Sequence, residues 1–206
     1  MTARVDHGST SGTFSLDGET HQVDNNVWVV GDDTECVVID APHDVDGILT
    51  AVGDRRVKAI LCTHAHDDHV RAAPALRDRV QAPIFLHPAD RPLWELTHTD
   101  QLWDVDLADG DTIEVAGVTL RVLHTPGHAP GAVCFHVPEL GCVFTGDTLF
   151  QGGPGATGRS FSDLGVLVGS IQDRLFGLPP DTVVHTGHGD DTTLGAEHEN
   201  VVAAEA

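Results

Sequence analysis

The sequence predicts an α/β fold, and three observations support this. Short runs of apolar and β-branched residues, the composition typical of buried strands, recur along the chain. Segments with helical spacing or helix-start signals lie between several of these runs. The chain has 206 residues, 40% hydrophobic and 21% charged, which suits one globular domain. We therefore expect a single domain over residues 1–206, with a strand or arm at residues 1–22 and a short tail at residues 199–206.

The first half of the chain is predicted to begin with strands and to continue with alternating strand and helix. Apolar runs on either side of a turn at residues 31–33 indicate the first two strands. Pro74 suits the first turn of a later helix, which leaves Asp68 and His69 in the loop before it. In order, the expected elements are strands 23–30 and 36–40, helix 44–52, strand 57–62, helix 73–80, strand 83–87 and helix 89–97.

The second half repeats the alternation, with Gly or Pro between the strand candidates. Leu164, Leu167, Ile171 and Leu175 recur at helical spacing, and Asp163 can cap the helix that they indicate. In order, the expected elements are strands 112–115, 118–123, 132–137 and 141–145, helix 164–175 and strand 182–185.

The net charge of −21 excludes several classes of partner. Nucleic acids and anionic membranes both require basic patches, so we expect neither. No apolar run is long enough to span a membrane, and the polar N-terminus does not resemble a signal peptide. The four cysteines lie in strand-like runs without CxxC spacing, which predicts buried free thiols and a cytoplasmic location. The sequence does not indicate an oligomeric state.

The most informative motif is the HxHxDH pattern at residues 64–69, within the run THAHDDH at 63–69. Three imidazoles and a carboxylate within six residues repel one another unless a cation lies between them. Further His and Asp candidates follow other predicted strands, and residues at strand ends converge on one rim of a sheet. The predicted metal ligands are His64, His66, Asp68, His69, His128, Asp147 and His188.

The spacing of these residues indicates two metal ions. His64 and His66 are two residues apart, so in an extended loop they point the same way and can share one ion. Asp68 and His69 can reach a second ion, and Asp147 is the candidate carboxylate that bridges both. We expect two divalent ions, zinc in the first place, although iron or manganese suits the same ligands. Asp68 and Asp147 are the predicted catalytic carboxylates.

Four motifs give the chain a plain resemblance to a known superfamily. The runs THAHDDH at 63–69, TPGHAPG at 125–131, TGDTLF at 145–150 and HTGHG at 185–189 resemble those of the metallo-β-lactamase-fold hydrolases, most closely the hydroxyacylglutathione hydrolase (glyoxalase II) branch. The resemblance implies an αββα sandwich of two mixed β-sheets flanked by helices, with metals at one edge.

The resemblance also implies how the ligands divide between the two metals. His64, His66 and His128 would hold the first metal, and Asp68, His69 and His188 the second, with Asp147 shared. The β-lactamases generally lack the bridging aspartate, so Asp147 argues against lactam hydrolysis. The glyoxalase II enzymes usually continue into a basic helical extension and often use tyrosines, whereas this chain stops 18 residues after His188 and has no Tyr. We therefore expect a carrier thiol other than glutathione, such as one of the mycothiol type.

Several other residues have two interpretations each. The glycine-rich segment 151–158 can form a mobile lid or a tight crossing, and Arg159 can bind a substrate carboxylate or form a structural ion pair. Asp40 can support a ligand histidine or end a turn. Trp94 and Trp103 can line the pocket or, as we favour, lie in the core.

The predicted reaction is hydrolysis of a small-molecule thioester by a metal-bridging hydroxide. A thiolate with a pKa near ~8.5 leaves without a strong general acid, and the sequence offers no obvious extra acid. The first alternative is a mononuclear iron persulfide dioxygenase, which uses the same ligand-like residues. The second is a non-catalytic metal-binding protein.

Overall fold

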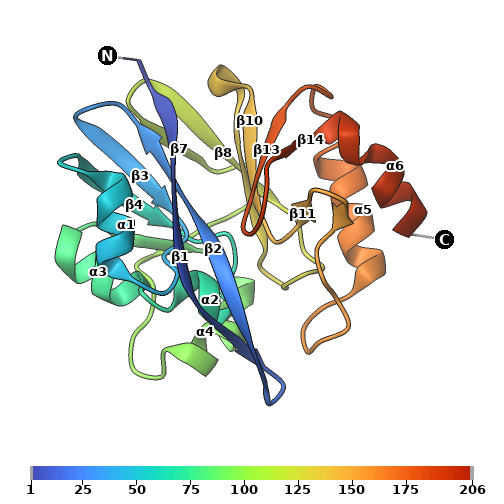
Figure 1. Cartoon of the computed structure of the whole chain (residues 1–206), viewed down its shortest axis with the longest axis horizontal. Helices are drawn as coiled ribbons and strands as arrows, with labels where there is room; N and C mark the ends of the chain where they lie inside the picture. The colour runs from blue at the N-terminus through green and yellow to red at the C-terminus, as the bar shows by residue number, and fades with distance from the viewer. Residues whose placement is uncertain (1, 205–206) are drawn as a thin grey trace.

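Two β-sheets face each other, with helices on both outer sides, in this computed structural model, which describes residues 2–204 (Figure 1). The first sheet has the order β1-β2-β3-β4-β5-β6, antiparallel at β1, β2 and β3 and parallel from β3 onward. Its strands are β1 (Arg4–Leu16), β2 (Glu19–Gly31), β3 (Glu35–Ile39), β4 (Arg56–Leu61), β5 (Ile84–Leu86) and β6 (Val105–Asp106).

The second sheet has the order β14-β13-β10-β9-β8-β7, and its one parallel pair is β10 with β13. Its strands are β7 (Thr112–Val115), β8 (Val118–His124), β9 (Val133–Val137), β10 (Cys142–Gly146), β13 (Val183–Thr186) and β14 (Thr192–Thr193). A separate two-stranded hairpin consists of β11 (Leu149–Phe150) and β12 (Gly153–Pro154).

The helices cover the two outer faces, α1 and α3 on the first sheet and α5 and α6 on the second (Figure 1). They are α1 (Val45–Val52), α2 (Asp67–Val70), α3 (Ala73–Val80), α4 (Arg91–Thr97), α5 (Leu164–Arg174) and α6 (Leu194–Ala204), with 3-10 turns η1 (Pro88–Asp90) and η2 (Pro138–Leu140). Asp44 and Asp163 accept hydrogen bonds from backbone N–H groups in the first turns of α1 and α5, as N-cap residues do. The predicted αββα sandwich is confirmed.

Side-chain alternation along β2 shows why two sheets pack together. Val27 and Val29 point outward, into the layer beneath α1 and α3, whereas Trp28 and Val30 point into the layer between the sheets. Because β2 is buried on both faces, its apolar run is continuous rather than alternating. A third apolar layer lies between the second sheet and the pair α5 and α6.

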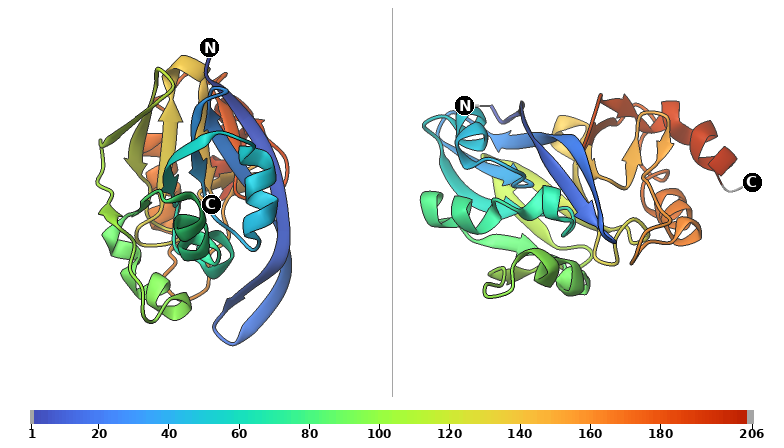
Figure 2. Two further views of the ribbon diagram at one scale, coloured as in Figure 1. Left: turned by 90° about the vertical axis from the view of Figure 1, so that its left-hand side faces the viewer. Right: turned by 60° about the horizontal axis from the view of Figure 1, so that its bottom comes forward.

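The β1–β2 hairpin is longer than the sequence indicates. The expected strand began at residue 23, but β2 begins at Glu19, and β1 makes a full strand of the expected arm. Asp17 and Gly18 form a two-residue turn with positive φ values of 55° and 80°, the backbone that an Asp-Gly hairpin turn favours. The tip of this hairpin extends beyond the rest of the sheet (Figure 2).

Three further expectations were wrong. Asp68 and His69 lie in the short helix α2 rather than in a loop, because the chain turns at once after His66. The expected tail at 199–206 belongs largely to α6, whose buried Leu194 and Val201 pack in the layer shared with α5. The helix expected at 89–97 begins as the 3-10 turn η1 and becomes α-helical only at Arg91. Residues 1, 205 and 206 of the expected arm and tail lie outside the described residues.

The cysteines and the helices bear on two further expectations. All four cysteines are buried free thiols, namely Cys36, Cys62, Cys134 and Cys142. Within residues 2–204, no helix combines the length and apolar character that crossing a membrane requires.

Candidate metal centre

The seven predicted ligands meet where strands of both sheets end. His64 and His66 follow β4, and α2 then supplies Asp68 and His69. The other three follow strands of the second sheet: His128 comes after β8, Asp147 after β10 and His188 after β13. Five of the seven are buried, and Asp147 and His188 are partly exposed to the adjoining pocket.

Three histidines form the first donor group. The Nδ1 atom of His66 lies 3.0 Å from His64 Nε2 and 3.0 Å from His128 Nε2. Such separations allow one ion to contact all three nitrogens. The expected grouping of His64, His66 and His128 is what the structure brings together.

The second donor group combines one carboxylate with two imidazoles. Asp68 Oδ2 lies 3.6 Å from His69 Nε2 and 3.2 Å from His188 Nε2, and the two imidazole nitrogens are 3.3 Å apart. This group also matches the division expected from the sequence.

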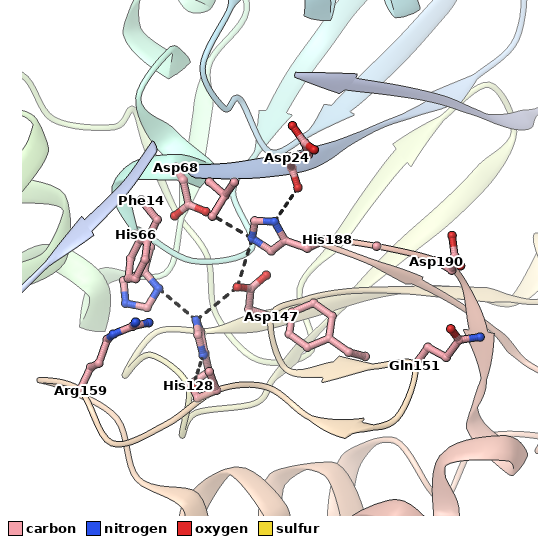
Figure 3. A pocket seen from close by; sticks show the side chains of 14 residues that line it. Phe14, Asp24, His66, Asp68, His128, Asp147, Gln151, Arg159, His188 and Asp190 are labelled. Atoms are coloured by element: carbon pink, nitrogen blue, oxygen red, sulfur yellow. Dashed lines mark hydrogen bonds and ion pairs between the residues drawn. The ribbon is translucent and has the colours of Figure 1, made fainter. Parts of the chain in front are cut away.

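Asp147 lies between the two groups (Figure 3). Its Oδ2 is 3.6 Å from His128 Nε2 in the first group and 3.5 Å from His188 Nε2 in the second, and its Oδ1 is 3.2 Å from His69 Nε2. One carboxylate therefore faces both groups, as the bridging role requires.

Outer hydrogen bonds fix which ring nitrogen carries the proton in four of the five histidines, all except His66. His128 Nδ1 donates to the carbonyl oxygen of Ala156, and His188 Nδ1 to that of Asp24, both at 2.7 Å. Because a carbonyl oxygen can only accept, the neutral rings direct their Nε2 lone pairs into the site.

Asp40 fixes two more rings. Its Oδ2 accepts hydrogen bonds from His69 Nδ1 and from the Thr63 hydroxyl, both at 2.8 Å. Since the Thr63 hydroxyl uses its proton on Asp40, its oxygen accepts from His64 Nδ1 at 3.1 Å. Both rings then direct Nε2 lone pairs inward, so Asp40 contacts the candidate ligand His69 directly and the candidate ligand His64 through Thr63.

The electrostatics of the cluster keep the first three histidines neutral and draw positive charge to His69 and His188, which face the carboxylates. Burial lowers the pKa of His66 to about 3 and also lowers the pKa of His64 and His128. Burial acts in the same direction on His188, but the carboxylates of Asp147 and Asp68 outweigh it and raise that pKa to about 10. Asp147 Oδ1 is buried without a hydrogen-bond partner of good geometry. Neutral imidazole lone pairs and a shared carboxylate that face the same places fit divalent cations.

Asn25 is a site residue that the sequence analysis missed. Its Nδ2 donates to Asp68 Oδ2 at 3.0 Å, and its Oδ1 accepts from His43 Nε2 at 2.7 Å. The amide is thus held in one orientation against the second donor group. An asparagine within the expected strand 23–30 carried no signal of this role.

A pocket of about 670 Å³ opens over the cluster (Figure 3). Arg159 lies on the side of His66, with its guanidinium 5.0 Å from the ring centre of Phe14 and 4.0 Å from Glu19. Asp24 and Asp190 line the pocket on the side of His188 and form no ion pair with any described residue.

Packing decides two other open interpretations, those of the glycine-rich segment and of the tryptophans. Gly155 crosses so close to Asp147 that an added Cβ would lie 1.7 Å from its carbonyl oxygen, so the glycine-rich segment makes a tight crossing. Gln151 and Ala156 of the same segment line the pocket. Trp94 is fully buried in the core, and Trp103 packs against it.

The chain is similar to several known proteins. A family model of the Metallo-beta-lactamase superfamily matches residues 22–188. An uncharacterized protein of Aquifex aeolicus is 35% identical over 189 residues, which cover 84% of this chain and 88% of the relative. Hydroxyacylglutathione hydrolase GloC of Haemophilus influenzae is 33% identical over 186 residues, which cover 83% of this chain and 87% of the relative.

Three solved structures share the fold at moderate identity. BLEG-1 B3 metallo-beta-lactamase has a TM-score of 0.78 at 30% identity, with 92% of this chain and 97% of that one covered. TTHA1623 in a di-iron-bound form has a TM-score of 0.74 at 34% identity, with 91% and 96% covered. ETHE1 from Myxococcus xanthus has a TM-score of 0.72 at 28% identity, with 90% and 80% covered.

Proposed function

Because this chain belongs to the metallo-beta-lactamase superfamily, we propose that it is a binuclear metal-dependent hydrolase that cleaves a thioester of a low-molecular-weight thiol. The observation that carries the proposal is the pair of donor groups with Asp147 between them. A purely structural site needs neither the second group nor the shared carboxylate.

The residues would hold the metals as their geometry divides them. His64, His66 and His128 would hold one ion, and Asp68, His69 and His188 the other, with Asp147 shared. Two such ions, zinc in our proposal, supply a hydroxide at neutral pH and polarise the carbonyl under attack. The protein's own part is to fix the ligands through Asp40, Asn25 and backbone carbonyls, and to bury the cluster from bulk water.

The pocket favours a leaving group that needs no proton. Outside the donor groups, the only carboxylates lining it among the described residues are Asp24 and Asp190, both exposed to solvent. Neither is buried in the way that keeps a carboxyl group protonated at neutral pH. A thiolate, with a pKa near ~8.5, departs unaided, whereas an amide nitrogen requires a general acid, so the pocket supports thioester over lactam cleavage.

The charge distribution of the pocket also bears on the carrier thiol. Arg159 is the one cationic side chain that lines it among residues 2–204, and Asp24 and Asp190 lie on the opposite side. A carrier with several carboxylates, such as glutathione, would meet repulsion on the acidic side. We therefore propose a carrier thiol of the mycothiol type, whose part facing Asp24 and Asp190 is neutral or carries an amine. In other respects we propose that the enzyme is similar to the hydroxyacylglutathione hydrolases. Buried free thiols support a cytoplasmic location.

One observation favours a second candidate function. The related structure of TTHA1623 contains two irons, so the donor set of this fold accepts iron. The alternative reaction remains the one expected from the sequence, oxidation of a persulfide at a single iron held by the same residues. Iron content together with oxygen consumption on adding a persulfide would support it over hydrolysis.

The test is a panel of thioesters that share one acyl group and differ in the carrier thiol, with a β-lactam and a persulfide included. We expect thioester hydrolysis by the wild-type protein and its loss, by at least about 100-fold, in Asp147→Asn. Asp191→Asn is the matched control, because Asp191 pairs with His185 away from the donor groups. Equal rates for Asp147→Asn and wild type, or turnover of the β-lactam or persulfide alone, would contradict the proposal.

A further inference from the structure

Asp90 is a buried carboxylate that the proposed chemistry does not use. It ends η1, immediately before α4, and its side chain is fully buried. No cationic side chain among residues 2–204 forms an ion pair with it. Burial raises its pKa to about 7, although two backbone hydrogen bonds act in the opposite direction. An unpaired buried carboxylate is costly, so its two acceptor oxygens need an explanation.

The two oxygens bind different ligand-bearing loops. Oδ2 accepts a hydrogen bond from the backbone N–H of Ala65 at 2.8 Å, and Oδ1 accepts one from that of Gly131. Ala65 lies between His64 and His66, and Gly131 lies three residues after His128. One carboxylate thus joins the loop of two members of the three-histidine group to the loop of the third.

The packing around Gly131 shows how closely this junction is fitted. A Cβ at Gly131 would lie 2.7 Å from the backbone nitrogen of Asp90 and 2.9 Å from its Oδ1. Only a residue without a side chain lets the loop come close enough to donate to the carboxylate. The junction therefore constrains both partners, the carboxylate and the glycine.

We propose that Asp90 is a positioning residue for the three-histidine group, holding the His64–His66 loop and the His128 loop at the spacing that places their ring nitrogens around one ion. A carboxyl group suits this task because its two oxygens accept one N–H each, from different loops. Asparagine has one acceptor oxygen and would set its amide N–H against one of the two donors. The inference rests on the proposed metal centre, and it assigns Asp90 to one of the two donor groups only.

The test titrates the metal-free protein with Co²⁺ or Zn²⁺ and follows the two binding steps by calorimetry and, for Co²⁺, by visible absorption. In Asp90→Asn we expect one affinity to fall about 10- to 100-fold, the range for outer-shell partners of metal ligands, and the other to stay unchanged. Gly131→Ala leaves the carboxylate in place and disturbs the same contact from the other side, so we expect the same selective loss. Gly131→Ala also keeps the inference testable if Asp90→Asn does not fold.

Glu197→Gln is the matched control. Glu197 is also a buried carboxylate that accepts a backbone N–H, from Gly152, but it contacts neither donor group. We expect lower thermal stability and two unchanged affinities. If Asp90→Asn and Gly131→Ala fold and keep both wild-type affinities, or lose both equally, Asp90 is not a positioning residue. If the wild-type protein itself does not bind two ions, the metal centre is wrong and the role of Asp90 falls with it.

Discussion

Replacing Asp40 by Asn would test how the protein orients its ligands. The Asp40 carboxylate accepts three hydrogen bonds: Oδ1 from the Thr63 backbone N–H at 2.7 Å, and Oδ2 from the Thr63 hydroxyl and His69 Nδ1 at 2.8 Å each. Asparagine has the same shape, but one oxygen becomes an NH₂ group. In one orientation this group faces the Thr63 N–H, and in the other it faces the Nδ1–H of His69, so a donor meets a donor either way.

The magnitude follows from the bond that is lost. His69 can escape the clash by moving its proton to Nε2, the atom that faces Asp68 and Asp147, which removes it as a ligand. A hydrogen bond to a charged group contributes about 1.5–3 kcal/mol, and at about 1.4 kcal/mol per factor of ten this corresponds to about 10- to 150-fold in metal affinity. We expect this loss in the group of Asp68, His69 and His188.

The assay is competitive titration of metal-free Asp40→Asn and wild-type protein with Zn²⁺ against a chromophoric chelator. Asp104→Asn is the control, because Asp104 also accepts a backbone N–H, from Ile84 at 2.8 Å, without contacting a donor group. Two affinities within about threefold of wild type in a folded Asp40→Asn protein would refute the argument from hydrogen-bond orientation.

Three further predictions follow from the same site. His188 has a pKa of about 10 in the folded metal-free protein against an ordinary 6.5, so its stabilising effect is complete below pH 6.5 and is lost as pH rises toward 10. The Tm of the metal-free protein should fall over that window more than in His188→Gln, and equal slopes would contradict the assignment. Gly155→Ala should abolish at least about 90% of activity, because the added Cβ would collide with the backbone of Asp147. Gly177→Ala is the control and should keep wild-type activity, because Gly177 has open space around it. Similar activities of the two variants in kinetic assays would contradict the tight crossing. Asp190→Asn should raise kcat/KM for anionic carrier thiols relative to neutral ones, and an unchanged ratio would show that the acidic side does not select the carrier.

The meeting of the seven candidate ligands was predictable because these residues are close in sequence or follow strong strand signals. The run from His64 to His69 is visible without any structure, and His128, Asp147 and His188 each follow an apolar run. Strand ends meet at one rim, so these signals were sufficient to bring the set together.

The supporting residues could not be predicted from local patterns. Asn25 contacts His188 across 163 positions of sequence, and Asp90 contacts Gly131 across 41. Contacts between residues so far apart produce no periodic pattern in the sequence. The helix α6 was missed for a related reason, because the buried Glu197 on its inner face is satisfied by Thr192, Asn200 and Gly152 and interrupts the apolar pattern.

The most direct test of the central claim is to add Zn²⁺ stepwise to metal-free protein while measuring hydrolysis of a chromogenic thioester. We expect the rate of thioester hydrolysis to rise with added Zn²⁺ and to reach a plateau at two ions per chain. No hydrolysis after two ions have bound would contradict the proposed function. So would a protein that needs only one iron per chain and consumes oxygen.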